Sequence, residues 1–153
     1  MTDLLNLRSA EMADAERLLE WRNDPATREA SHNQDVISLD VHIEWLSNSL
    51  NKPDQRQLWI AEIDGVAVGT CRADRVENAW ELSWTVAPEV RGKGVAYQML
   101  SKLVRSFDES LVAQVKADNF GSLKVAERVG FVLDKQEGSV LFYVYPKTSF
   151  IAG

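Results

Sequence analysis

The sequence contains a single cysteine, Cys71, and only two histidines among its 153 residues. A lone cysteine cannot form an internal disulfide, which favours a reducing compartment such as the cytoplasm. Cys71 lies in an expected strand, and we interpret it as a small buried side chain rather than a nucleophile. No cluster of cysteine and histidine has the spacing of metal ligands, so no metal site is predicted.

Long apolar runs are also missing. No stretch approaches the roughly 20 apolar residues that a membrane-spanning helix needs, and the first residues lack the basic region and apolar core of a secretion signal. The net charge of −6 and the pI near 4.9 argue against nucleic acid or an anionic membrane as the main partner. The length predicts one domain, spanning residues 1–153.

Strand and helix patterns alternate in the order β-α-α-β-β-β-α-β-α-β-β. Strands are expected at residues 4–7, 58–63, 66–72, 80–86, 111–116, 131–133 and 140–145, and helices at 11–22, 38–50, 95–107 and 119–129. Asp64-Gly65 is typical of a type I′ hairpin turn, and Asn23-Asp24-Pro25 is a helix stop. The order predicts a mixed α/β (α+β) fold, with an antiparallel front and a parallel crossover at the back.

Three local features need a more detailed expectation. Residues 26–36 form a polar stretch with little periodicity. Ser38 is placed to cap the second helix, in which Leu39, Ile43 and Leu46 are expected to face one way. The final strand is rich in apolar residues that could pair across a homodimer, namely Val140, Leu141, Phe142 and Val144.

A glycine-containing loop between an expected strand and an amphipathic helix is the strongest functional signal, with the sequence Arg91-Gly92-Lys93-Gly94-Val95-Ala96. The first amides of a helix have no internal partner, and the helix dipole adds partial positive charge there. Because Gly92 and Gly94 have no Cβ, a pyrophosphate could approach these amides closely. Arg91 and Lys93 could add charge-assisted contacts. The alternative is an ordinary helix start with permissive glycines and solvated charges.

Two other phosphate-binding motifs do not fit this loop. A nucleotide P-loop needs Lys followed by Ser or Thr after its last glycine, whereas Lys93 is followed by Gly94 and Val95. The dinucleotide motif G-x-G-x-x-G needs a third glycine, and Tyr97 occupies that position.

Arg91-x-x-Gly94-x-Ala96 resembles the Q/R-x-x-G-x-G/A signature of the GNAT superfamily of acetyltransferases. Downstream, Asn119-x-x-Ser122, followed by Gly130-Phe131, resembles that family's second cofactor motif. The resemblance implies a mostly antiparallel, twisted sheet flanked by helices, with splayed central strands. It also implies that acetyl-CoA is the cofactor.

The resemblance further implies where acetyl-CoA would bind. Residues around Val86 would bond the pantetheine arm, and the pyrophosphate would meet Arg91, Gly92, Lys93, Gly94, Val95 and Ala96. Asn119 and Ser122 would lie on the far side of the arm.

Transfer of an acetyl group to an amine needs a base, an oxyanion site and a proton for the leaving thiolate. Many family members carry a glutamate on the strand before the loop, and Glu81 is our candidate base; the alternative is an exposed strand carboxylate. Backbone amides near Val86 would hold the oxyanion. Many relatives have a tyrosine as acid where this chain has Ala126. Ser122 resembles a serine of the ribosomal-protein N-terminal acetyltransferase branch, but it could instead cap the helix or bond the cofactor.

The N-terminal half indicates the acceptor. It resembles the acetyltransferases of bacterial nonulosonic acid (pseudaminic acid-type) biosynthesis, which acetylate nucleotide-linked aminosugars, at Leu19-Glu20-Trp21-Arg22-Asn23-Asp24-Pro25, Arg28, Ser31, Ile37-Ser38-Leu39, His42 and Trp45. Trp21 could stack on a sugar or base, Arg22 or Arg28 could meet a phosphate, and Asn23 belongs to the same candidate acceptor site. The alternative is that Trp21 packs in the core, that Arg22 is a charge at the helix C-terminus, and that Asn23-Asp24-Pro25 only ends the helix.

Three functions therefore compete. The first is an aminosugar N-acetyltransferase, with a small-molecule amine as partner. The second is a peptide or protein N-acetyltransferase, which the Ser122 resemblance favours. The third is a non-catalytic module that binds acyl-CoA, which Ala126 in place of tyrosine favours.

Overall fold

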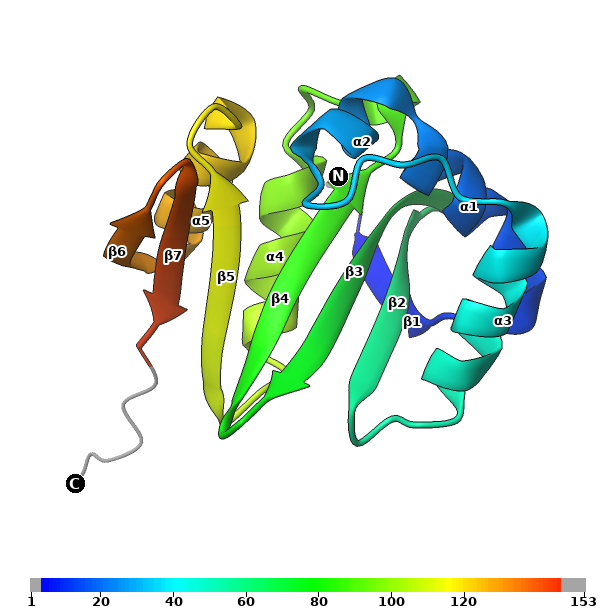
Figure 1. The fold of residues 1–153 in the computed structure, drawn as a ribbon, viewed down its shortest axis with the longest axis horizontal. Helices are drawn as coiled ribbons and strands as arrows, with labels where there is room; N and C mark the ends of the chain where they lie inside the picture. The colour runs from blue at the N-terminus through cyan, green and yellow to red at the C-terminus, as the bar shows by residue number, and fades with distance from the viewer. Residues whose placement is uncertain (1–3, 147–153) are drawn as a thin grey trace.

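The structure, a computed structural model, describes residues 4–146 and contains one seven-stranded sheet with helices on both faces (Figure 1). Its strands are β1 (Leu5–Ser9), β2 (Arg56–Ile63), β3 (Val66–Val76), β4 (Ala79–Val86), β5 (Ser110–Lys116), β6 (Val132–Glu137) and β7 (Val140–Tyr145). Its helices are α1 (Ala15–Asn23), α2 (Pro25–Ala30), α3 (Leu39–Leu50), α4 (Val95–Val104) and α5 (Phe120–Val129), with 3-10 turns η1 (Met12–Asp14) and η2 (Pro88–Val90). None of these helices has the length and apolar character that crossing a bilayer requires.

The sheet order is β1-β2-β3-β4-β5-β7-β6, and every neighbouring pair is antiparallel except β4 and β5. The expected mixed fold with a mostly antiparallel sheet is therefore confirmed. The β2–β3 turn is also as expected, since Asp64 and Gly65 have φ values of 53° and 78°, which a type I′ turn requires. Cys71 lies in β3 and is 1% exposed, so it is a core side chain.

Two hydrophobic clusters hold the layers together. One lies between the sheet and α4, where Met99, Leu100 and Leu103 pack against strand residues such as Leu82 and Leu111. The other joins α1, α3 and β2 on the opposite face, through Leu18, Trp21, Leu46, Leu58 and Ile60. Burying such apolar surface is the main favourable term in folding.

Helix α3 begins as expected but buries a different face. Ser38 caps it by accepting a hydrogen bond from the Val41 amide at 3.4 Å. Leu46 is fully buried, whereas Leu39 and Ile43 are 43% and 38% exposed. The buried face instead carries His42. The expected apolar face was therefore wrong in part, because the helix turns two polar residues, His42 and Ser49, toward the sheet along with Leu46.

Helix α2 lies within the stretch for which the sequence showed little periodicity. Asp24 caps it by accepting the Thr27 amide at 3.2 Å, and Pro25 takes its first position. Proline at that position loses no hydrogen bond and has a helical φ already. The residues that end α1 therefore also begin α2, and the helix is too short to show an apolar stripe.

The parallel pair β4 and β5 is joined over only three residue pairs, from Ala79–Ser110 to Glu81–Val112. Both strands continue well beyond that point, β4 to Val86 and β5 to Lys116. Their carboxyl-terminal halves therefore diverge and leave a gap in the middle of the sheet.

The expectation that the last strand could pair across a dimer is wrong for sheet pairing. Strand β7 is bonded to β5 on one edge and to β6 on the other. Its backbone groups are therefore already used, and the free edges of the described sheet belong to β1 and β6.

Candidate active site

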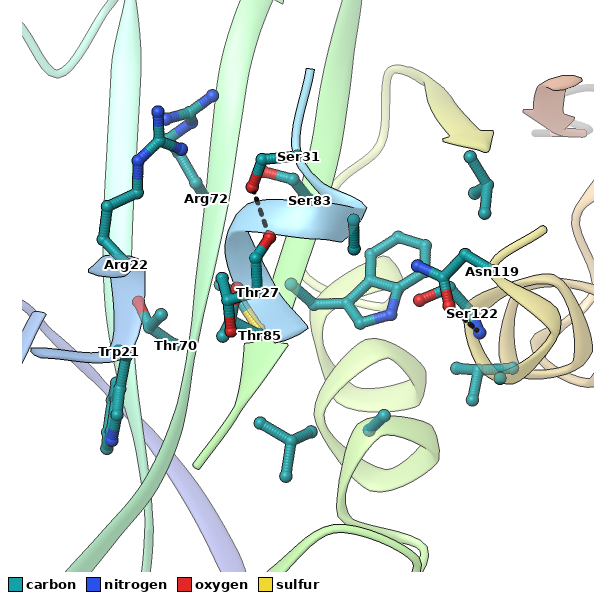
Figure 2. A pocket seen from close by; sticks show the side chains of 18 of the residues that line it. Trp21, Arg22, Thr27, Ser31, Thr70, Arg72, Ser83, Thr85, Asn119 and Ser122 are labelled. Atoms are coloured by element: carbon teal, nitrogen blue, oxygen red, sulfur yellow. Dashed lines mark hydrogen bonds between the residues drawn. The ribbon is translucent and has the colours of Figure 1, made fainter. Parts of the chain in front are cut away.

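One cleft of about 1260 Å³ joins the gap between β4 and β5 to the open face of β3 and β4. Its walls come from the glycine loop, the first turns of α4 and α5, helix α2, and the helices α1 and α3 (Figure 2). Pockets for one small ligand usually measure roughly 300–1,000 Å³. The cleft is therefore large enough for two molecules that meet within it.

The glycine loop has the geometry that anion binding requires. Gly92 and Gly94 have φ values of 79° and 78°, and a Cβ at either position would meet no atom within 4 Å. Gly94 caps α4, and the first amide of this helix with a backbone partner is that of Gln98, which donates to the Gly94 carbonyl at 3.2 Å. The preceding amides are thus available to an anion.

The basic side chains of this loop lie differently from the expectation. The Arg91 guanidinium donates to Asp24 and to the Thr27 hydroxyl, both at 3.0 Å. A phosphate contact by this side chain would have to share or replace that ion pair. Lys93 is exposed and does not line the cleft, whereas Gly92, Gly94, Val95 and Ala96 do.

The diverging edge of β4 supplies main-chain groups to the cleft. Val86 pairs with Gly69 of β3, and the next amide, that of Ala87, donates to the Val68 carbonyl at 2.8 Å. Since successive amides of a strand point to opposite edges, the Val86 amide points into the gap. The indole nitrogen of Trp84 is buried there, with no hydrogen-bond partner among the described residues.

Glu81 lies in the cleft at the last residue pair that joins β4 to β5. Burial raises the pKa of its carboxyl group, and the charge of Asp74 acts in the same direction. Arg72, His32 and a hydrogen bond from Gln114 at 3.4 Å oppose that rise in pKa. The net effect is a raised pKa, which makes this carboxylate a stronger base than an exposed glutamate.

Asn119 and Ser122 line the cleft at the start of α5. Asn119 caps the helix, because its side-chain oxygen accepts the Ser122 amide at 3.3 Å. The Ser122 hydroxyl is therefore not the cap, and it makes no hydrogen bond within residues 4–146. Ala126 is fully buried. Tyr143 is 1% exposed and donates to Glu127 at 2.7 Å, so it is a packing residue.

Three of the four expected acceptor residues make structural contacts. Trp21 is 4% exposed and packs in the second cluster, and it also lines the cleft. Asn23 donates to the Ile37 carbonyl at 2.9 Å and accepts its amide at 3.0 Å. Arg28 donates to the Asn23 carbonyl at 3.1 Å and does not line the cleft. These contacts are the ones that the alternative, packing and chain termination, predicts.

Arg22 does lie in the cleft, and its guanidinium group is beside that of Arg72 (Figure 2). Sequence reasoning missed Arg72, Trp84 and Gln114. Arg72 and Trp84 stand in strands with ordinary alternation, and only the register shows which side chains share the cleft. Glu81 was the only sequence candidate that leads to two of them, because Gln114 and Arg72 lie close enough to change its pKa.

Helix α2 crosses the cleft and is tied to both of its sides (Figures 1 and 2). Its first turn holds Arg91 through Asp24 and Thr27. At its other end, the Lys116 ammonium group at the end of β5 donates to the Glu29 carbonyl at 3.0 Å. The helix therefore bridges the opening between the diverging strands.

Comparison with known families identifies the class of protein. Residues 5–132 match the family model described as acetyltransferase (GNAT) domain. Because this match covers most of the chain, the chain belongs to the GNAT acetyltransferases. It is an acetyl-CoA-dependent N-acetyltransferase. A search among curated proteins finds no match.

Solved structures share the fold at low sequence identity. RimL, a ribosomal L7/L12 alpha-N-protein acetyltransferase in complex with coenzyme A, is 18% identical over 94% of each chain, with a TM-score of 0.81. The ribosomal-protein-alanine N-acetyltransferase from Brucella melitensis is 24% identical over 91% of this chain and 98% of that chain, with a TM-score of 0.77. AAC(6')-Ib in complex with ribostamycin and coenzyme A is 16% identical over 98% of this chain and 100% of that chain, with a TM-score of 0.82.

Replacing Asn23 tests its structural role. Asn23→Ala removes both hydrogen bonds to Ile37 and should lower the free energy of unfolding by about 1–3 kcal/mol, because partly buried backbone groups lose their partners. Asn48→Ala, at an exposed position of α3, is the control and should change it by less than about 0.5 kcal/mol. Urea titration measures both values. Equal stability of the two variants would contradict the structural role.

Proposed function

We propose that this acetyltransferase acts in the cytoplasm on the primary amine of an aminosugar, free or nucleotide-linked. Arg22 in the cleft is available to the phosphate of a nucleotide-linked acceptor. One observation carries the proposal: a single cleft joins the glycine loop to a polar pocket that contains the carboxylate of Glu81, whose pKa is raised, and the guanidinium groups of Arg22 and Arg72. The hydroxyl side chains of Thr70, Ser83 and Thr85 line the same cleft and suit an acceptor rich in hydroxyl groups.

The residues present fit acetyl-CoA. The open glycine positions and free amides from Gly92 to Ala96 would hold the pyrophosphate, and backbone groups of the residues around Val86 would bond the pantetheine arm. The amide group of Asn119 and the hydroxyl of Ser122 would face the arm from α5. When bound, the cofactor supplies a thioester whose acetyl carbon accepts the amine.

Replacing Gly94 tests the loop. Gly94→Glu places a carboxylate where we expect phosphate and should weaken coenzyme A binding by about 100-fold, because like charges brought together cost several kcal/mol. Gly65→Glu is a matched control, since Gly65 has the same φ of 78° and equally open space but lies in the β2–β3 turn. Calorimetric titration with coenzyme A measures the affinities. If the Gly94 variant binds coenzyme A as the wild type does, the glycine loop is not the pyrophosphate site.

Glu81 is the proposed base. An alkylammonium acceptor must lose a proton before its nitrogen can attack a carbonyl carbon, and a carboxylate of raised pKa takes that proton more readily. The Val86 amide, directed into the gap, would stabilise negative charge that develops on the carbonyl oxygen. The free hydroxyl of Ser122 is the proposed proton donor to the leaving thiolate.

Replacing Glu81 tests the base. Glu81→Gln keeps the shape of the side chain and should lower turnover roughly 100- to 10,000-fold, with little change in the KM for acetyl-CoA. In the wild type, the rate should rise with pH through the raised pKa of Glu81, because only the carboxylate accepts a proton. Glu44→Gln, at an exposed site on α3, is the control. Wild-type turnover by the Glu81 variant at every pH would remove this residue as base.

A thiol-release screen tests the acceptor class. With acetyl-CoA, we expect turnover on amino sugars or nucleotide-linked amino sugars and none on peptides with free N-termini. The competing function is N-acetylation of a peptide or protein, which is favoured by the free Ser122 hydroxyl. Turnover on peptides alone would establish that function and reject the aminosugar proposal.

A further inference from the structure

Positive charge is concentrated on one face of the sheet, in a chain whose net charge is −6. Arg22 at the end of α1 and Arg72 on β3 both line the cleft, with their guanidinium groups side by side (Figure 2). Arg56 on β2 lies next to them, since it shares the carboxylate of Asp74 with Arg72. Asp74 thus pairs with two of these three guanidinium groups, those of Arg56 and Arg72.

Arg72 is held in a fixed position. Its Nε donates to Asp74 at 2.9 Å, and its guanidinium lies over the Trp45 ring, 5.7 Å from the centroid. Arg56 stacks on the same ring at 5.3 Å, and His42 supports that ring from α3 with centroids 5.7 Å apart. A guanidinium fixed in this way loses little conformational entropy when it binds a ligand.

Arg22 has no such partner. Within residues 4–146 its half-buried guanidinium makes no ion pair and no hydrogen bond with another side chain. Burial lowers the pKa of Arg22, and the charge of Arg72 lowers it further, yet an arginine in a protein stays protonated. Burying an unpaired charge beside a like charge is costly. Nearby, the buried Nε2 of His42 also lacks a partner within the described chain.

We propose that Arg22 and Arg72 form an anion-binding subsite that holds an oxyanion of the acceptor, so that this enzyme acetylates amines that also carry a phosphate or a carboxylate. The subsite deepens the proposed function and rests on it for the amine. Two adjacent guanidinium forks offer parallel N–H donors that match the oxygens of either group. An anion there would also neutralise the charge that the protein leaves uncompensated.

The register places this subsite close to the proposed base. Arg72 is opposite Ser83 and Asp74 is opposite Glu81 in the β3–β4 pairing. Paired residues in an antiparallel sheet point to the same face, and two positions along a strand span about 7 Å. An acceptor with its anionic group on Arg72 would therefore hold an amine within reach of Glu81 if a short skeleton separates them. Polyamines, which lack an anionic group, would be repelled.

Anion binding can be measured without turnover. The enzyme is saturated with coenzyme A to fill the glycine loop and then titrated with inorganic phosphate and, separately, with acetate at constant ionic strength. Calorimetry and the side-chain NMR signals of Arg22 and Arg72 report binding. We expect the wild type to bind, and Arg22→Gln to weaken the affinity at least about tenfold, as the loss of a charged hydrogen-bond donor does. Binding of phosphate alone indicates a phosphorylated acceptor, and binding of acetate as well includes carboxylates.

Two further variants make the test decisive. Arg105→Gln removes one positive charge directly after α4, at a residue outside the cleft, and should bind both anions as the wild type does. Arg22→Lys keeps the charge but loses the planar fork, so it should bind more weakly than wild type and more tightly than Arg22→Gln. If Arg22→Gln fails to fold, the lysine variant carries the test, and wild-type affinity in it would overturn the subsite.

The outcomes separate this inference from the proposed function. No anion binding by the wild type, or equal affinity in Arg22→Gln, overturns the subsite even if amino sugars are acetylated. Arginine-dependent phosphate binding without turnover on any amino sugar leaves the subsite and rejects the acceptor class. Finally, glucosamine 6-phosphate should be a better substrate or a tighter competitive inhibitor than glucosamine; equal behaviour of the two would count against the subsite.

Discussion

The divergence of β4 from β5 is the constraint on which the rest of the site depends. Three residue pairs hold the two strands together, and beyond Glu81 each strand has a bare edge in the middle of a sheet. Buried backbone groups without partners cost free energy, so such a gap is stable only if water or a ligand satisfies it. The fold thus contains an unfilled sheet position, which an extended ligand with amide groups can occupy.

The gap also sets where every other part of the site must lie. The glycine loop follows the end of β4 and leads into α4, so its free amides lie at the end of the gap where β4 ends. Helix α5 begins after β5 and brings Asn119 and Ser122 to the other side. Helix α2 then bridges the opening through Arg91 and Lys116. Local sequence shapes each of these parts, but the divergence of two strands brings them together.

This division explains what could be predicted from the sequence. The Asp64-Gly65 turn, the Ser38 cap and the glycine loop depend on neighbouring residues, and their local patterns were sufficient. Helix α2 was missed because one Asp-Pro pair both ends and begins a helix. Arg72 was missed because its place in the cleft depends on the β3–β4 register and on Trp45 of α3. The residues next to Arg72 in the sequence carry no information about either. The run from Trp21 to Asn23 allowed two interpretations, because tryptophan and asparagine serve packing as readily as binding.

The charges in the cleft are coupled, and this gives the acceptor's second group a role in the chemistry. Burial raises the pKa of Glu81, while Arg72 lowers it. An oxyanion on Arg72 would offset the charge of that guanidinium and remove part of its lowering effect, so the pKa of Glu81 would rise further. A carboxylate with a higher pKa is a stronger base. The base would therefore be strongest when a suitable acceptor is in place, and an amine without an anionic group would meet a weaker one.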